Sequence, residues 1–218
     1  MPILTTARFH TTVAALHQLP RDGLLEVAFV GRSNAGKSSA INVLCNRKRL
    51  AFSSRTPGRT QALNYFTVGP EDRPLAYLVD TPGYGYASAP LETKRTWDQL
   101  AGQYLQRRPQ LAGVVLLADI RRGLTDLDRR LIGWVPPAAR LAIVLTKSDK
   151  LGRQQVRQVM LEVERELAAV RPGADNVVRA FSALNRSGRD DLLGLVENWI
   201  EAGLPAGAPT VEDEKKPR

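Results

Sequence analysis

The stretch Gly31-Arg-Ser-Asn-Ala-Gly-Lys37-Ser38 decides the fold of this 218-residue chain. It follows a short apolar run at residues 26–30 and precedes a helix-like pattern at 38–44. A loop of this kind between a strand and a helix turns its backbone N–H groups onto phosphates, and its glycines permit the tight wrap. Lys37 offers a point charge to the phosphates and Ser38 a hydroxyl to Mg²⁺. The sequence therefore predicts a nucleotide-binding P-loop.

The rest of the chain alternates short apolar runs with helix-like patterns, which indicates an α/β domain with a mostly parallel sheet. Six strands are expected, at 26–30, 62–68, 75–80, 111–119, 140–146 and 176–181. Residues 69–74 are too few for a crossover helix, so the second and third strands should pair antiparallel, with the second as an edge strand. Helices are expected on both faces, at 38–44, 93–106, 125–134, 153–170 and 188–200.

The composition indicates one soluble domain from a reducing compartment. Cys45 is the single cysteine, so no disulfide can form within the chain. Residues 1–20 lack the apolar run of a signal peptide, and the longest apolar stretch, 111–118, is too short to cross a bilayer. We expect a cytoplasmic monomer without membrane contact. It would have an extension at 1–22, one domain at 23–202 and a disordered tail at 203–218.

The charge balance suggests a polyanionic partner. Lys and Arg number 31 against 22 Asp and Glu, a formal net charge of +9. Nucleic acid is the simplest partner of that kind. The alternative is that the 24 arginines reflect codon usage and lie on solvated helix faces. Charge alone does not separate the two.

A second motif, Asp80-Thr-Pro-Gly83, ends an apolar run. A carboxylate here can hold Mg²⁺, usually through water, and the Gly83 N–H can sense a γ-phosphate. By itself, Asp-x-x-Gly is an ordinary exit from a strand. After a P-loop it indicates a nucleoside triphosphatase.

A third motif, Thr146-Lys-Ser-Asp149, distinguishes guanine from adenine. The Asp149 carboxylate can accept hydrogen bonds from N1–H and the exocyclic amine of guanine, whereas adenine has neither donor on that edge. Lys147 would pack its stem against the base and reach back to the P-loop. Ser182-Ala183-Leu184 is weak evidence alone, but it lies where a backbone N–H, from Ala183, can reach guanine O6. Together these motifs predict GTP and GDP as ligands.

The loop at 53–61 is rich in hydroxyls, Gly and Pro. A switch loop needs a threonine here to close on Mg²⁺ and the γ-phosphate. Thr56 and Thr60 are both candidates, and the place of Thr60 just before the expected edge strand favours it. The alternative is a purely structural loop.

The motifs GRSNAGKSS, RTPGRTQ, DTPGYGYA, TKSDK and FSAL, in this order and spacing, resemble the EngB (YihA/YsxC) bacterial ribosome-assembly GTPases of the Era–EngA–MnmE-like group. The resemblance covers about residues 20–201 and implies a Ras-like P-loop GTPase fold with GTP and Mg²⁺ as ligands. It also implies a role in assembly of the large ribosomal subunit, with rRNA as partner, and a requirement for normal cell division and septation.

By position, the resemblance implies these roles. Phosphate binding falls to Gly31, Arg32, Ser33, Asn34, Ala35, Gly36, Lys37 and Ser38. The switch loop contributes Gly58, Arg59, Thr60, Gln61 and Ala62. Sensing of the γ-phosphate falls to Asp80, Thr81, Pro82 and Gly83. Guanine binding falls to Thr146, Lys147, Ser148, Asp149, Phe181, Ser182 and Ala183. Mg²⁺ ligation falls to Ser38, Thr60 and Asp80, and catalysis to Lys37, Thr60 and Asn34.

Two positions depart from Ras-like enzymes. Thr146 stands where many GTPases have Asn, although EngB-like proteins often have Thr. Tyr84 occupies the place of the glutamine that orients the attacking water, and a phenol cannot offer the paired donor and acceptor of an amide. We therefore expect slow hydrolysis. The resemblance adds K⁺ as a candidate cofactor, because related proteins hold K⁺ with an Asn at the position of Asn34.

Three functions are compatible with these motifs. The leading one is a GTP-hydrolysing switch on pre-ribosomes. The second is a nucleotide-dependent RNA- or ribosome-binding module with negligible hydrolysis, and Tyr84 keeps it open. A tRNA-modifying or membrane-remodelling relative is disfavoured because the expected organisation has a single domain.

Overall fold

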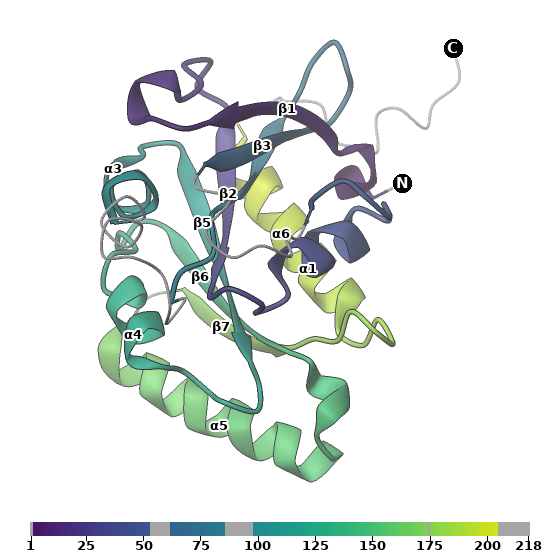
Figure 1. Cartoon of the computed structure of the whole chain (residues 1–218), viewed down its shortest axis with the longest axis vertical. Helices are drawn as coiled ribbons and strands as arrows, with labels where there is room; N and C mark the ends of the chain where they lie inside the picture. The colour runs from purple at the N-terminus through teal and green to yellow at the C-terminus, as the bar shows by residue number, and fades with distance from the viewer. Residues whose placement is uncertain (1, 53–61, 86–97, 174, 205–218) are drawn as a thin grey trace.

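The computed structural model describes residues 2–52, 62–85, 98–173 and 175–204 (Figure 1). Its centre is a seven-stranded sheet in the order β1-β3-β4-β2-β5-β6-β7. The strands are β1 (Arg8–Val13), β2 (Leu25–Gly31), β3 (Leu63–Val68), β4 (Ala76–Asp80), β5 (Leu111–Asp119), β6 (Arg140–Thr146) and β7 (Asn176–Ala180). The α-helices are α1 (Lys37–Leu44), α3 (Gln103–Arg107), α4 (Asp126–Ile132), α5 (Arg153–Val170) and α6 (Arg189–Gly203).

The sheet is mostly parallel. The strands β4, β2, β5, β6 and β7 pair in parallel, whereas β3 pairs antiparallel with β4 on one side and β1 on the other. The antiparallel pairing of β3 with β4 confirms the prediction from the short connection at 69–74. An α/β fold with a mostly parallel sheet is likewise confirmed.

The strand count corrects the sequence prediction of six strands with residues 62–68 at the edge. The seventh strand is β1, which lies within the segment expected to be an extension and covers the outer side of β3. The sequence signal is weak because most β1 residues are exposed or half-buried and the register shifts between Phe9 and Thr11. Such irregularity is common at sheet edges.

Helices cover both faces of the sheet, as predicted. α1 and α6 lie on one face and α3, α4 and α5 on the other (Figure 1). Alternate residues of β2 pack into the two cores. Val27 and Phe29 lie on the α1/α6 side, and Ala28 and Val30 lie on the opposite side. This double coverage explains the nearly continuous apolar runs of the central strands.

One expected helix, 93–106, is only partly within the described residues. The described part starts with a π-helical turn, η3 (Asp98–Gly102), and continues as α3. The shorter helical turns are η1 (Ile3–Thr6), η2 (Leu16–Gln18) and η4 (Ser148–Lys150). Among the described residues, no helix is both long and apolar enough to span a bilayer.

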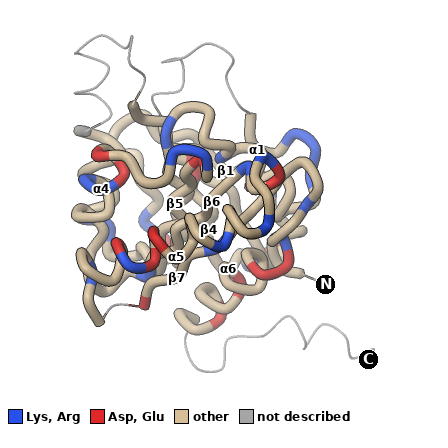
Figure 2. The backbone as a smooth tube through the Cα atoms, turned by 90° about the horizontal axis from the view of Figure 1, so that it is seen from below, with Lys and Arg blue, Asp and Glu red and all other residues tan. Residues whose placement is uncertain are grey.

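The carboxyl ends of the parallel strands meet at one edge of the sheet. β2 ends at Gly31, β4 at Asp80, β5 at Asp119 and β6 at Thr146. Figure 2 views the molecule from this end, where Lys and Arg lie on several of the surrounding loops. In open α/β sheets this edge is where ligands bind.

Candidate functional site

The P-loop connects β2 to α1, and two of its glycines are required by geometry. A Cβ at Gly31 would lie 2.6 Å from the carbonyl oxygen of Leu117, so β5 leaves no room for a side chain. Gly36 has φ +92°, a left-handed conformation, at the residue that caps α1. The loop therefore turns sharply into α1, whose first backbone N–H groups have no partner within the helix.

The end of β6 holds two successive carbonyls of the P-loop. The Thr146 hydroxyl lies 2.7 Å from the oxygen of Ala35 and 3.1 Å from that of Ala118, and its single proton serves the closer contact. The Lys147 ammonium donates to the oxygen of Asn34 at 3.0 Å, as the sequence predicted. In a trans peptide the C=O and N–H point in opposite directions, so the Gly36 N–H is directed away from Thr146. This arrangement fixes the curvature of the loop.

Lys37, Ser38 and Asp80 converge at the foot of the P-loop. The Lys37 ammonium lies 3.7 Å from Asp80 Oδ1, and Ser38 Oγ lies 3.5 Å from Asp80 Oδ2. The Asp80 side chain is 7% exposed, and its Oδ1 has no hydrogen-bond partner among the described residues. Burial raises the pKa of Asp80, and the neighbouring Lys37 opposes that rise. The carboxylate thus has acceptor capacity that a cation could fill.

These groups fit a magnesium ion. Mg²⁺ prefers hard oxygen ligands and is usually held by one or two carboxylates together with substrate phosphates and water. The Asp80 carboxylate and the Ser38 hydroxyl are the described residues that would hold it, directly or through water. Bound Mg²⁺ neutralises phosphate charge. Thr60, the third expected ligand, lies outside the described residues.

The Asp149 carboxylate is held by a neighbouring loop. The hydroxyl of Ser182 donates to Asp149 Oδ1 at 2.6 Å and accepts a bond from the Leu184 N–H at 3.2 Å. Lys150 lies 3.3 Å from Asp149 Oδ2, and the Ser148 N–H donates to the Phe181 carbonyl at 3.1 Å. The Ser182 bond, followed by the contact with Lys150, lowers the pKa of Asp149. An ionised, oriented acceptor therefore stands at the ends of β6 and β7.

The Asp80–Gly83 turn packs directly on the P-loop. A Cβ at Gly83 would lie 3.0 Å from Ser33 Cα, and the Ser33 N–H donates to the Tyr84 carbonyl at 2.9 Å. The Thr81 N–H and hydroxyl both reach the Phe29 carbonyl, at 3.1 and 3.0 Å. The 80–83 turn and the P-loop are therefore in direct contact.

The side chain of Tyr84 belongs to the core. It is 7% exposed, and its hydroxyl donates to Asp128, a buried carboxylate that also accepts from the N–H and hydroxyl of Thr125. Thr125 stands at the N-cap position of α4, where Asp128 accepts from both its backbone N–H and its hydroxyl. The Tyr84 hydroxyl is therefore held by Asp128 inside the core.

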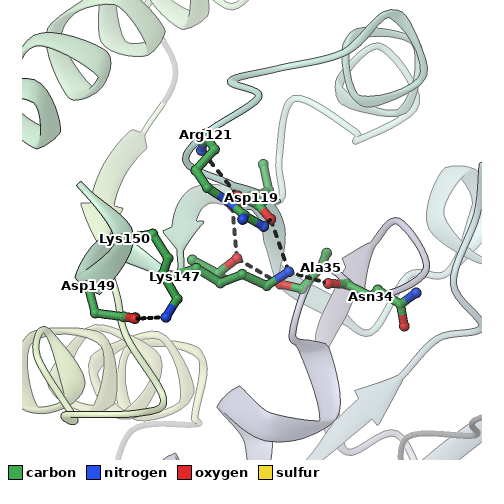
Figure 3. A network of polar contacts seen from close by, with 9 residues as sticks. Asn34, Ala35, Asp119, Arg121, Lys147, Asp149 and Lys150 are labelled. Carbon is green, nitrogen blue, oxygen red and sulfur yellow. Dashed lines mark hydrogen bonds and ion pairs between the residues drawn. The ribbon is translucent and has the colours of Figure 1, made fainter.

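A network of ion pairs beside the P-loop was not predicted from the sequence (Figure 3). Arg121 donates to Asp119, and Asp119 in turn accepts from Lys147. The available signal was that Asp119 ends a buried strand in the same way as Asp80. These three side chains border a cavity of about 210 Å³ between residues 32–35 and the loop that follows β5.

Of the expected switch-loop residues, one lies within the described part of the chain. Gly58, Arg59, Thr60, Gln61 and the alternative Thr56 lie outside the described residues, whereas Ala62 is half-buried just before β3. The remaining expected residues lie on the P-loop, the 80–83 turn and the ends of β6 and β7. All of these are at the carboxyl edge of the sheet.

The comparisons with known proteins agree with one another. The family model described as 50S ribosome-binding GTPase matches residues 26–147, more than half of the chain. A "Probable GTP-binding protein EngB" of Burkholderia pseudomallei (strain 1106a) is 52% identical over 210 residues, covering 94% of each chain. The protein with that name from Burkholderia ambifaria (strain MC40-6) is 50% identical over 217 residues, covering 98% of this chain and 96% of that one.

Two solved structures share the fold. The crystal structure titled as a probable GTP-binding protein engB aligns with a TM-score of 0.60 and 19% identity, over 81% of this chain and 99% of that chain. A variant of Era from Aquifex aeolicus bound to GDP and AlF4⁻ gives 0.63 and 23%, over 84% of this chain and 58% of that chain. The predicted P-loop GTPase fold is confirmed.

Proposed function

The chain belongs to the EngB family of GTP-binding proteins, and on that premise we propose that it is a slow, cytoplasmic GTPase switch that acts as a monomer in large ribosomal subunit assembly. In this role it would be needed for normal cell division and septation. The observation that carries the proposal is the convergence of Lys37, Ser38 and Asp80 beside a P-loop whose carbonyls are fixed by Thr146 and Lys147.

The residues take distinct roles in this proposal. The P-loop and Lys37 bind the phosphates, Ser38 and Asp80 hold Mg²⁺, and the turn at Gly83 responds to the γ-phosphate. Asp149, oriented by Ser182, accepts the hydrogen bonds of guanine. Thr60 would complete the metal site in the GTP state.

Slow hydrolysis follows from the position of Tyr84. Its hydroxyl is engaged by Asp128 in the core, so the usual water-orienting amide has no replacement at that position. The same observation supports a second candidate function, a nucleotide-dependent ribosome-binding module with negligible hydrolysis. Single-turnover GTP hydrolysis with and without large ribosomal subunits separates the two, because a switch should be accelerated by its target and the module should not.

Hydrolysis is expected to be faster in K⁺ than in Na⁺, by about 100-fold if the cation acts as one transition-state contact. The reason is Asn34, whose carbonyl is held by Lys147 while its side chain extends away from that network (Figure 3). The measurement is GTP turnover in KCl and NaCl at matched ionic strength. Asn34→Gly is the control, because glycine suits the φ of +64° at this position and removes the side-chain amide.

Equal rates of the parent protein in the two salts would remove K⁺ from the proposal. They would leave GTP binding untouched, because no contact assigned to guanine or to Mg²⁺ involves the Asn34 side chain. If Asn34→Gly kept the full K⁺ effect, the cation would be held elsewhere.

Ribosome contact is proposed for the basic segment that follows α1. Arg47, Lys48 and Arg49 are all exposed. The segment is already shaped by Asn42, whose Oδ1 accepts from the N–H groups of Leu50 and Ala51 at 2.9 Å each. Three adjacent cations on a fixed loop suit the phosphates of rRNA. Arg55 and Arg59, two further arginines of the loop at 53–61, lie outside the described residues.

Replacement of Arg47, Lys48 and Arg49 by alanine is expected to weaken GTP-dependent co-sedimentation with the large subunit by about tenfold or more near physiological salt. The salt dependence should also become shallower, by about one unit of slope for each phosphate that the variant no longer neutralises. GTP affinity should be unchanged. The matched control removes three exposed arginines from α5, Arg153, Arg157 and Arg165, and should sediment like the parent. Equal loss in both triple variants would mean that only total charge matters, and no loss in either would place the contact elsewhere.

A further inference from the structure

The Asp119 carboxylate lies between two cations at the end of β5 (Figure 3). On the solvent side, Arg121 donates through Nε to Oδ1 at 2.9 Å and through Nη2 to Oδ2 at 2.6 Å. On the inner side, the Lys147 ammonium donates to Oδ2 at 2.9 Å. The Asp119 side chain is 10% exposed, whereas those of Arg121 and Lys147 are 49% and 35% exposed. The carboxylate is therefore the most buried of the three charged groups.

Lys147 is unusual in having both its backbone and its side chain fixed. Its φ of +59° and ψ of +35° are left-handed, which is uncommon for a residue other than glycine. Its ammonium is held at 3.0 Å by the Asn34 carbonyl and at 2.9 Å by Asp119. A lysine with four rotatable bonds would otherwise sample many positions at this half-exposed site. Asp119 provides the only charged partner of the ammonium among the described residues.

We propose that Asp119 is a positioning residue for the guanine base: by holding the Lys147 ammonium, it keeps the alkyl stem of Lys147 where the purine packs. The inference rests on the proposed function, which assigns Thr146–Asp149 to guanine. Restricting the lysine before the ligand arrives removes an ordering penalty from binding, which is the general advantage of preorganisation.

Arg121 has a lesser part in this arrangement. The hydrogen bonds from its guanidinium lower the pKa of Asp119 more than those from Lys147 do. Yet its backbone N–H also donates to Asp119 Oδ1, at 3.1 Å, and that bond does not need the side chain. Removing the guanidinium should leave Asp119 oriented and still paired with Lys147. Arg121→Ala is therefore a matched control that removes a charge from the same carboxylate.

The test is the affinity for GDP, measured by calorimetry, in Asp119→Ala, Asp119→Asn, Lys147→Met, the double variant Asp119→Ala/Lys147→Met, and Arg121→Ala. Asp119→Ala should weaken GDP binding by about tenfold, and Asp119→Asn by less because an amide oxygen remains a neutral acceptor. Lys147→Met keeps an apolar side chain but loses the hydrogen bonds of the ammonium, and its GDP affinity should also fall by about tenfold. Arg121→Ala should stay within about twofold.

An Asp119→Ala variant that binds GDP like the parent would overturn the proposal, and once the single variant shows its loss the double variant is decisive. If Asp119 acts through Lys147, Asp119→Ala should add no more than about twofold to the loss in Lys147→Met. A non-hydrolysable GTP analogue should show the same ratios, because the base is common to both nucleotides. Thermal unfolding without nucleotide checks that each variant folds. Lys147→Met and Asp119→Asn keep the test available if Asp119→Ala does not fold.

Two further results would overturn the proposal. Additive losses in the double variant would mean that Asp119 affects GDP independently of Lys147. A loss in Arg121→Ala as large as that in Asp119→Ala would assign the effect to local charge rather than to position. If the folded parent failed to bind GDP, the proposed function itself would be refuted, and the two failures are thus distinguishable.

Discussion

Asp149→Asn is expected to change the base preference of the protein from guanine to xanthine. The carboxylate can accept from both N1–H and the exocyclic amine of guanine, and the substitution replaces one of these acceptors with a donor. Xanthine carries a carbonyl where guanine has the amine, so the new amide can pair with it. Hydrogen bonds to a charged group contribute about 1.5–3 kcal/mol each, so GDP affinity should fall by about 100-fold or more.

The structure indicates that this substitution would keep the orientation of the side chain at position 149. Asp149 is ionised, because the Ser182 hydrogen bond lowers its pKa, and one of its oxygens is fixed by that bond at 2.6 Å. The side chain of Ser182 is itself buried, so the acceptor cannot turn away easily. An asparagine of the same shape can accept the Ser182 bond through its amide oxygen and present its NH₂ group to the base.

Calorimetry with GDP, XDP and ADP measures the effect. The parent should prefer GDP over ADP by several orders of magnitude, because adenine would leave a carboxylate unpaired. Lys150→Ala is the control: it removes the other contact of Asp149, at 3.3 Å, from a lysine that is 53% exposed, and should change GDP affinity little. Equal affinity of the parent for ADP and GDP would refute the assignment of guanine recognition to Asp149.

Local motifs made most of the candidate site predictable. The P-loop, Asp80–Gly83 and Thr146–Asp149 each follow an apolar strand, and parallel strands bring their carboxyl ends to one edge. Lys37 follows one such strand and Asp80 ends another, and in the structure the two side chains lie 3.7 Å apart. The antiparallel pairing of β3 and β4 was predictable for a similar reason, the shortness of their connection.

Features that depend on contacts between distant segments were not predictable. β1 is mostly polar and exposed, and only its partner β3 makes it a strand. The sequence around Asp119 resembles that of any strand end. Its contact with Lys147 exists only because β6 lies beside β5 in the fold. Propensity and periodicity describe a segment by itself, whereas these features arise from pairs of segments.

The buried ion pair of Glu26 and Arg108 is the clearest feature of this kind. Glu26 is 0% exposed, and Arg108 donates to its Oε1 through Nε at 2.9 Å and Nη2 at 2.6 Å. The hydroxyl of Tyr65 donates to Oε2 at 3.3 Å, and Arg108 Nη2 also reaches the Pro20 carbonyl at 2.6 Å. The pair thus joins β2, β3, the residue that follows α3 and the segment before β2.

Arg108→Ala is expected to lower the free energy of unfolding by about 3–5 kcal/mol, because it leaves Glu26 as an uncompensated buried charge. For a domain of this size the melting temperature should fall by about 10 °C. Urea unfolding at neutral pH measures the change. GDP affinity of the folded variant should be unaffected, since Glu26 lies near the amino end of β2 and the P-loop follows its carboxyl end.

Two comparisons identify the cause of that loss. Arg129→Ala breaks an exposed pair with Glu166 and should cost less than about 1 kcal/mol, because water screens both partners. Adding Glu26→Gln to Arg108→Ala should recover part of the lost stability, because it removes the stranded charge and keeps an acceptor for Tyr65. If Arg108→Ala proved as mild as Arg129→Ala, or if Glu26→Gln made it worse, water would be reaching Glu26 and the pair would not stabilise this end of the sheet.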